Sequence, residues 1–316
     1  MTDMDSEAEH AAAKSDSSRH PPLPLQQTNG DPSSVQAGGQ TPAPYPRIKN
    51  AVLLLLLLLG LQLVLGFALG IVLALAGLAL NGLTLSIINI LSFAAVILIA
   101  VKKMHVPLFS VLNVEVLHAE LIFPILVSCC GFSILLSEIN NLTQLLLPMR
   151  GFWSTFFRAM FIPERILSSL VLFVVVAPIT EELLFRRIIL DGFLRNYRAV
   201  AAIVLSSLFF GLVHLNPWQF ITSFLLALYL SWLYLKTRSL FLCIVGHAFN
   251  NFIPMAVIGM AKLNIPGYSG ESATRFQPVW FDLLGVLLAG AGLYLTYRVV
   301  KQLESGFTPP RRADAA

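Results

Sequence analysis

The sequence predicts an all-α fold, a polytopic membrane bundle of about eight transmembrane helices. Of the 316 residues, 56% are hydrophobic and only 12% are charged, whereas a soluble domain carries about 25% charged residues. The mean hydropathy is +0.76, and the apolar residues lie in long uninterrupted runs. A chain with so little polar surface cannot cover a water-soluble globule, so we expect it to lie in a bilayer.

The apolar runs define the expected spans, each compared with the ~20 residues that cross the hydrocarbon. Eight segments qualify, at approximately 51–79, 83–101, 121–137, 166–190, 199–216, 218–235, 240–260 and 279–299. Only the Asn216-Pro217 turn separates the fifth segment from the sixth. The stretch 138–165 holds two prolines and two Phe-rich patches, and it predicts either an interfacial helix or a partly re-entrant segment.

The polar stretches divide the chain into five parts. Residues 1–46 are rich in Ser, Pro, Gly and Gln and predict a disordered tail, with no signal peptide. Residues 47–165 hold the first transmembrane segments and the interfacial region, and 166–260 form a helical core. A loop and the last transmembrane helix occupy 261–303, and 304–316 form a C-terminal tail.

The basic residues predict the topology. With the N-terminus inside and eight spans threaded, 16 of the 21 Lys and Arg residues fall inside, as the positive-inside rule expects. Both termini are therefore expected in the cytoplasm, with a bacterial plasma membrane as the expected location and an endomembrane as the alternative. The net charge is +4, but the basic residues flank the hydrophobic segments and form no basic face, so no nucleic-acid partner is expected.

Ionisable residues interrupt the fourth apolar segment, where Thr-Glu-Glu-Leu-Leu-Phe-Arg-Arg runs from Thr180 to Arg187. Such side chains cost about 2.5–3.5 kcal/mol at a membrane helix centre, so they usually mark a function. Glu182 and Arg186 are four residues apart and predict an ion pair on one helix face. Glu181 points about 100° away and remains available as a general base. A bundle-stabilising ion network without chemistry is the alternative.

Pro178 lies one turn before these carboxylates. A proline inside a helix removes a backbone N–H and strains the carbonyl four residues earlier, here that of Val174. The sequence therefore predicts a local kink or a widened helix at this point.

Two further segments carry polar residues within apolar helices. His214 lies within the fifth segment, and His247 and Asn251 share one face of the seventh. The imidazole and carboxamide of that face can coordinate a metal, hold a water or donate to a developing oxyanion. The alternatives are a packing histidine and an interhelical hydrogen-bond pair. Counted from the inner ends, Glu181 and His247 lie about 14 and 11 Å deep, but His214 lies about 22 Å deep, which requires an extended or tilted fifth helix.

These residues resemble the signature of the CPBP family of intramembrane metal-type endopeptidases. That family contains the type II CAAX prenyl endopeptidases and bacteriocin-processing, Abi-like relatives. Its patterns Glu-Glu-x-x-x-Arg, Phe-x-x-x-His and His-x-x-x-Asn occur here in the same order, over about residues 166–260. They begin at Glu181, Phe210 and His247 respectively.

The resemblance implies an intramembrane endopeptidase that cleaves membrane-embedded or lipidated substrates. Glu181 would activate a water, which His214 and Asn251 help to hold. His247 would stabilise the oxyanion or join the polar ligands, and the Glu182 and Arg186 pair would support the site. The implied catalytic residues are thus Glu181, Glu182, Arg186, His214, His247 and Asn251.

A metal is a further expectation. Glu181, His214 and His247 could bind a divalent ion such as Zn²⁺ and leave a position open for water. The chain has no contiguous His-Glu-x-x-His helix, so a glutamate-activated water without metal is equally expected. The expected partners are the lipid bilayer and a membrane-anchored or prenylated peptide or protein substrate.

Two other functions compete with the protease. A catalytically silent immunity or scaffold protein of the same family would keep the fold without the chemistry. An ion-coupled transporter would also bury Glu and His, but it predicts internal repeats with broken helices, and the two halves of the chain show no clear repeat.

Overall fold

The computed structural model describes residues 44–114, 118–268 and 275–306, and every regular element in this part is a helix. Seven helical stretches are long and apolar enough to cross a membrane. The chain is therefore an integral, multi-pass membrane protein, and the predicted helical bundle is confirmed. Most of the tail predicted over 1–46, and the end of the 304–316 tail, lie outside the described residues.

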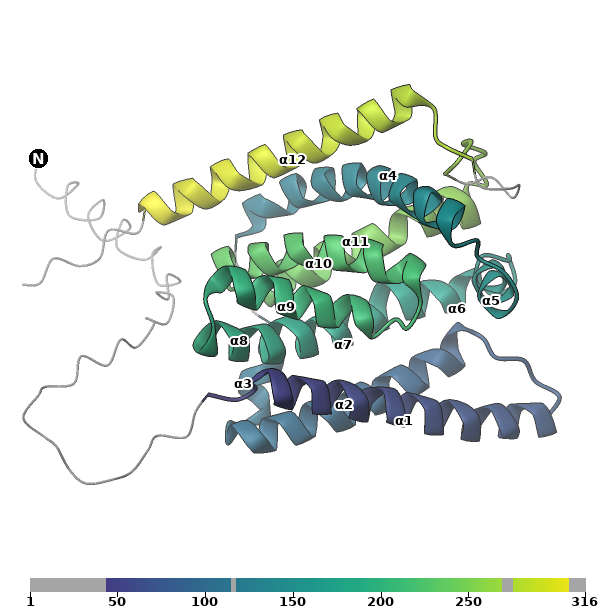
Figure 1. Cartoon of the computed structure of the whole chain (residues 1–316), viewed down its shortest axis with the longest axis horizontal. Coiled ribbons are helices and arrows are strands. Elements are labelled where there is room, and N and C mark those ends of the chain that lie inside the picture. The colour runs from purple at the N-terminus through teal and green to yellow at the C-terminus, as the bar shows by residue number, and fades with distance from the viewer. Residues whose placement is uncertain (1–43, 115–117, 269–274, 307–316) are drawn as a thin grey trace, which may run out of the picture. The chain divides into compact units, whose positions relative to one another are not determined.

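The elements follow one another with short connections (Figure 1). They are α1 (Ile48–Leu75), α2 (Gly82–Met104), α3 (Leu108–Leu112), η1 (Ala119–Leu121), α4 (Ile122–Leu146), α5 (Phe152–Met160), α6 (Ile166–Leu170), η2 (Val171–Val176), α7 (Ala177–Glu182), η3 (Leu183–Leu190), α8 (Asp191–Asn196), α9 (Ala199–Leu212), α10 (Pro217–Thr237), α11 (Leu240–Pro254), η4 (Met255–Met260) and α12 (Val279–Gly306). Segments η2, η3 and η4 are π-helical, and η1 is a 3₁₀ turn.

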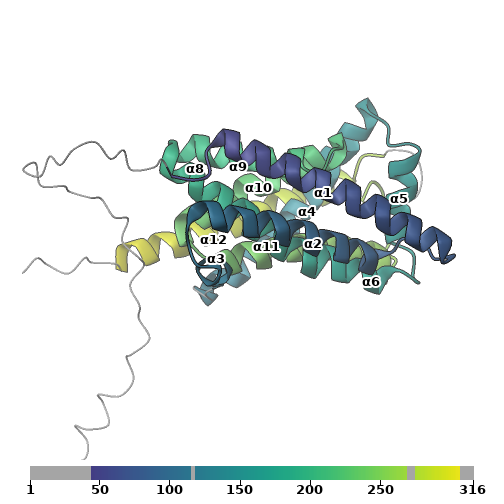
Figure 2. The ribbon, with the colours of Figure 1, turned by 90° about the horizontal axis from the view of Figure 1, so that it is seen from below.

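The helices form three groups in the bundle. Helices α1 and α2 pack along one side, and α4 and α12 pack together along the opposite side (Figures 1 and 2). Elements α6 to α11 fill the space between them, so the polar motifs lie in the middle of the bundle. Helix α1 begins and α12 ends at the same end of the bundle (Figure 1).

Close packing of α4 against α12 depends on small residues. A Cβ added at Gly131 would meet the backbone of Ala289, and one added at Gly292 would meet Ser128. Because lipid supplies no hydrophobic drive between helices, such close backbone approach is a main source of attraction in a membrane. Helix α1 differs, since only five of its 28 residues are buried.

The fourth span is one continuous helical stretch, Ile166–Asn196, longer than the predicted 166–190. It contains two π-helical segments, η2 before α7 and η3 after it. At the end of η2 the Ala177 N–H bonds the Leu172 carbonyl, five residues back rather than four. The widened helix predicted from Pro178 is therefore confirmed, and Glu181 and Glu182 lie on the short α-helical piece between the two π-segments.

The fifth predicted span, 199–216, is not a full span. Helix α9 ends at Leu212 after 14 residues, about 21 Å at 1.5 Å per residue, which is shorter than the ~30 Å hydrocarbon. The chain then turns through Leu215, whose φ is +55°, and Asn216 caps α10 by accepting from the Gln219 N–H at 2.9 Å. His214 therefore lies in the turn beyond the helix end rather than inside a span.

The stretch 138–165 resolves into the end of α4 and the short helix α5. Helix α5 crosses the direction of the main helices at one end of the bundle (Figure 1). The rings of Trp153, Phe156 and Phe157 contact one another on it, the first and last stacked and the other two pairs edge to face. Aromatic residues of this kind gather at membrane interfaces, so the geometry favours the interfacial helix over the re-entrant segment.

Candidate active site

The carboxylate of Glu182 and the guanidinium of Arg186 form the buried centre of the site. Glu182 Oε2 lies 2.9 Å from Arg186 Nε, and the two side chains are 0% and 1% exposed. The guanidinium carbon also lies 4.7 Å from the ring centre of Phe210 on α9. The ion pair predicted from the four-residue spacing is confirmed, and the ring of Phe210 covers its positive end.

Glu182 also holds His247, which the sequence did not indicate. Its Oε1 atom lies 2.8 Å from His247 Nδ1. A carboxylate paired with arginine is ionised and only accepts hydrogen bonds, so Nδ1 carries the proton and donates. In the neutral imidazole, Nε2 is then an acceptor with a free lone pair. The Arg186–Glu182 pair thus fixes both the orientation and the tautomer of His247.

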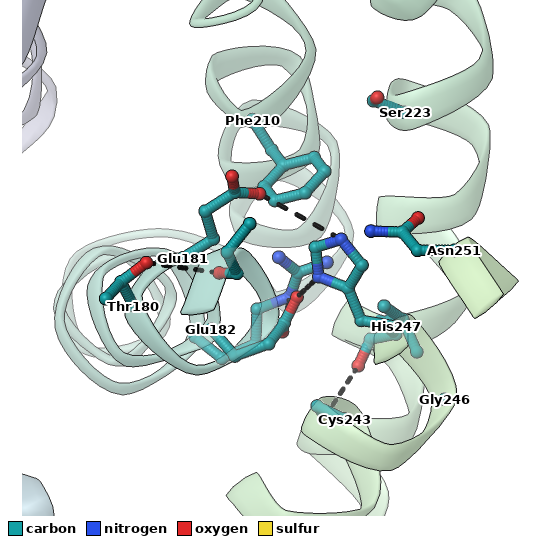
Figure 3. Close-up of polar contacts among 12 residues, drawn as sticks. Thr180, Glu181, Glu182, Phe210, Ser223, Cys243, Gly246, His247 and Asn251 are labelled. Atoms are coloured by element: carbon teal, nitrogen blue, oxygen red, sulfur yellow. Dashed lines mark hydrogen bonds and ion pairs between the residues drawn. The ribbon is translucent and has the colours of Figure 1, made fainter. Parts of the chain in front are cut away.

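The free nitrogen of His247 faces Glu181. His247 Nε2 and Glu181 Oε2 are 4.0 Å apart, and Figure 3 shows both carboxylates directed toward this imidazole. The Glu181 side chain is 12% exposed and that of His247 is 6% exposed. Among the described residues, Glu181 therefore has no partner within direct hydrogen-bond distance, in contrast to Glu182.

His214 reaches the same region from the turn after α9. Its Nδ1 lies 3.0 Å from the Phe210 carbonyl, which only accepts, so Nδ1 donates and Nε2 of the neutral ring is an acceptor. The ring of Phe210 lies 5.6 Å from the ring of His214 and 5.6 Å from that of His247. Phe210, the first residue of the Phe-x-x-x-His motif, therefore separates the two imidazoles.

Ser223 on α10 is a site residue that the sequence gave no signal for. Its Oγ lies 3.5 Å from His214 Nε2, and Figure 3 places it beside the cluster. A lone serine in an apolar helix carries no pattern, so only the packing of α9 against α10 reveals this neighbour.

Asn251 lies one turn after His247 on α11. Its Nδ2 donates to the Phe173 carbonyl in η2 at 2.9 Å. The residue therefore links α11 to the helix that carries Glu181. Glu182 contacts both Arg186 and His247 directly, and Glu181 faces His247 across 4.0 Å. His214 and Asn251 join this group through Phe210 and through the η2 backbone.

Metal binding can be tested against the donor geometry. Among the described residues, no group of three or more His, Cys, Asp or Glu side chains lies close enough to hold one metal ion. The set Glu181, His214 and His247 therefore does not fit a three-ligand zinc site in this conformation. The metal stays a prediction from the sequence, and we derive no reaction step through it.

An aromatic groove elsewhere in the bundle is not part of this cluster. It has a volume of about 370 Å³ and is lined by Phe132, Tyr229, Trp232, Leu293 and Tyr297. None of these residues belongs to the polar motifs.

Comparison with known proteins points to the same segment. Residues 163–253 match the family model described as type II CAAX prenyl endopeptidase Rce1-like. The match runs from just before α6 to within α11, and it includes all six predicted site residues. The family inferred from the motifs is thereby confirmed. No curated protein and no solved structure matches the chain.

Proposed function

Residues 163–253 of this chain belong to the Rce1-like family, and from this membership we propose that the protein is an intramembrane endopeptidase. The proposal is that it hydrolyses peptide bonds of membrane-embedded or lipidated substrates with a water activated by Glu181. One observation carries it: the Glu181 carboxylate faces, across 4.0 Å, the free Nε2 of an imidazole whose orientation is fixed.

The gap between Glu181 and His247 suits one water molecule. A water that donates one hydrogen to Glu181 Oε2 and the other to His247 Nε2 makes two ordinary hydrogen bonds of ~2.8 Å. Two atoms 4.0 Å apart can share one water in this way. The lone pairs of the water oxygen then point away from both acceptors and toward a substrate carbonyl. We also propose that His214, whose Nδ1 donates to the Phe210 carbonyl, offers Nε2 as a third acceptor to water near this one, in place of its long 3.5 Å contact with Ser223 Oγ.

The proposed reaction balances with Glu181 as the only proton carrier. Glu181 takes a proton from the water while the water oxygen bonds to the carbonyl carbon of the substrate. This step gives a tetrahedral oxyanion. The carbon–nitrogen bond then breaks, and the proton on Glu181 passes to the leaving nitrogen. Glu182 and Arg186 take no part in the transfer. They hold His247 in the tautomer that accepts from the water.

The membrane setting supports a lipidated or transmembrane substrate. Such a substrate partitions into the bilayer and presents its peptide bond at the depth of the cluster, where water reaches only along polar side chains. The family description names CAAX prenyl endopeptidases, which makes a peptide with a prenylated cysteine near its C-terminus the first substrate class to test. We also propose that both termini lie in the cytoplasm of a bacterial cell, on the balance of basic residues.

The test uses full-length protein purified in detergent, with two probe peptides. One ends in a farnesylated Cys-aliphatic-aliphatic-X sequence, and the other is an unmodified transmembrane peptide. We expect the wild type to cleave the farnesylated peptide, and we expect Glu181→Gln to lower kcat by about 10²–10⁴-fold because the isosteric amide accepts no proton.

Two controls make the result decisive. Glu304→Gln removes a half-exposed carboxylate that pairs with Lys236 at 2.9 Å, far from the site residues in sequence, and it should cleave like the wild type. Full activity of Glu181→Gln would remove this residue from the mechanism. A wild type that cleaves neither peptide would favour the silent immunity or scaffold relative. A chelator should leave cleavage unchanged, since no proposed step uses a metal.

A further inference from the structure

Pro178 leaves one backbone carbonyl beside the site without a helical donor. In a π-helix each N–H bonds the carbonyl five residues earlier. Ala177 N–H follows this register and bonds Leu172 O, so the next N–H, that of residue 178, would bond Phe173 O. Proline has no N–H. The Phe173 carbonyl is therefore freed by the sequence at the place where η2 meets α7.

The side chain of Asn251 satisfies this carbonyl. Its Nδ2 donates to Phe173 O at 2.9 Å across 78 residues of chain. A carbonyl accepts and never donates, so the amide nitrogen and not the amide oxygen must point toward η2. Figure 3 agrees, because it shows the Asn251 nitrogen directed to the side of His247 and Glu181 and the oxygen turned the other way.

The orientation decides what Asn251 offers to a substrate. One N–H of the Asn251 amide donates to Phe173 O. The second N–H is on the same nitrogen, which lies on the side of His247 and Glu181. The two imidazoles donate through Nδ1 to Phe210 O and to Glu182, so their inward nitrogens are acceptors. Among these motif side chains, the Asn251 amide is the one that brings a neutral N–H donor to the site.

We propose that Pro178 is a positioning residue: by freeing the Phe173 carbonyl, it anchors the Asn251 amide so that its second N–H donates to the oxyanion. This deepens the proposed endopeptidase function and rests on it. An oxyanion donor acts on the charge that develops in the transition state, so it raises kcat more than it changes KM. A metal ligand or water acceptor would instead need the amide oxygen to face the cluster.

A double-mutant cycle tests the anchor without catalysis. In the wild type, Asn251→Ala leaves the part-buried Phe173 carbonyl without its side-chain donor and should lower the thermal midpoint of the detergent-solubilised protein. In the Pro178→Ala background, the new backbone N–H can reach Phe173 O, so Asn251→Ala should lower the midpoint by less than half as much. Pro178→Ser restores the same N–H and serves if the alanine variant is not recovered.

The kinetic cycle tests the consequence. We expect Asn251→Ala to lower kcat on the farnesylated peptide by about 10²–10³-fold with KM within about twofold. Pro178→Ala should lower kcat in the wild-type background and add nothing in the Asn251→Ala background. Pro124→Ala is the matched control, because it makes the same substitution in α4, which contributes no residue to the site.

The outcomes separate the two proposals. Equal thermal losses on Asn251→Ala in both backgrounds would overturn the anchor, and so would equal kcat losses on Pro178→Ala with and without Asn251. If the wild type cleaves neither probe peptide, the proposed function fails, and the thermal cycle still decides whether Pro178 positions Asn251.

Discussion

Replacing Arg186 by Met tests the buried ion pair on which the site is built. The Nε–Oε2 distance is 2.9 Å and neither side chain exceeds 1% exposure, so solvent cannot replace the lost partner. Removing one member of such a pair costs about 3–5 kcal/mol because the other charge stays buried. The contact of the guanidinium with the Phe210 ring at 4.7 Å would be lost as well.

One effect opposes this loss. His247 Nδ1 already donates to Glu182 at 2.8 Å, so the carboxylate keeps one hydrogen-bond donor when Arg186 is lost. We therefore expect a loss near the lower limit, about 3 kcal/mol. Arg186 also holds the carboxylate that orients His247. Arg186→Met should therefore lower cleavage strongly while the protein remains folded.

The assay is reversible unfolding in mixed micelles of increasing SDS fraction, followed by tryptophan fluorescence. Arg298→Met is the matched control, since Arg298 is exposed and bonds only Tyr294 among the described residues, at 2.7 Å. It should cost less than about 1 kcal/mol. The double variant Glu182→Gln/Arg186→Met removes both charges and should recover part of the loss. If Arg186→Met is as stable as the control, the ion pair does not hold the site together and the reasoning fails.

Three smaller predictions use the same unfolding assay. Gly131→Val should lower the free energy of unfolding by at least about 1–3 kcal/mol, because its side chain would enter the backbone of α12. The control Gly60→Ala has open space around it and should leave stability unchanged, so equal effects of the two substitutions would contradict the close packing of α4 against α12. Thr180→Val and Asn89→Leu should couple by about 0.6 kcal/mol through their 2.7 Å hydrogen bond, and strict additivity would show that the bond adds nothing. Asn81→Ala should cost about 1 kcal/mol, since its Oδ1 caps α2 by accepting from Leu83 and Thr84; an unchanged midpoint would count against the cap.

Local spacing made part of the site predictable from sequence. The pair of Glu182 and Arg186 follows from four-residue spacing on one helix, and the structure has it. The widened helix follows from Pro178, because a missing N–H disturbs the ladder wherever the proline falls. Both predictions concern residues within two helical turns of each other, where helix geometry alone fixes the neighbours.

The sequence did not predict which residues of different helices are in contact. The hydrogen bond between Glu182 and His247 joins residues 65 apart, and the periodicity of each helix does not indicate which of its faces meets the other helix. Nor did any pattern indicate that Asn251 would bond a main-chain carbonyl rather than its neighbour His247. A polar side chain in an apolar helix indicates that it has a partner, because an unpartnered polar group is costly in lipid. It does not indicate which residue that partner is.

The error in the fifth span shows why depth counting fails near a site. A straight helix over the apolar run from 199 to 216 places His214 about 22 Å deep, well beyond Glu181 and His247. The helix in fact ends at Leu212, and the imidazole reaches back to the Phe210 carbonyl at 3.0 Å. A count of 1.5 Å per residue holds only within a helix, so it does not apply to a residue in the turn. Asn216 and Pro217 mark the start of the next helix, whereas the end of α9, at Leu212 and Val213, carries no polar residue.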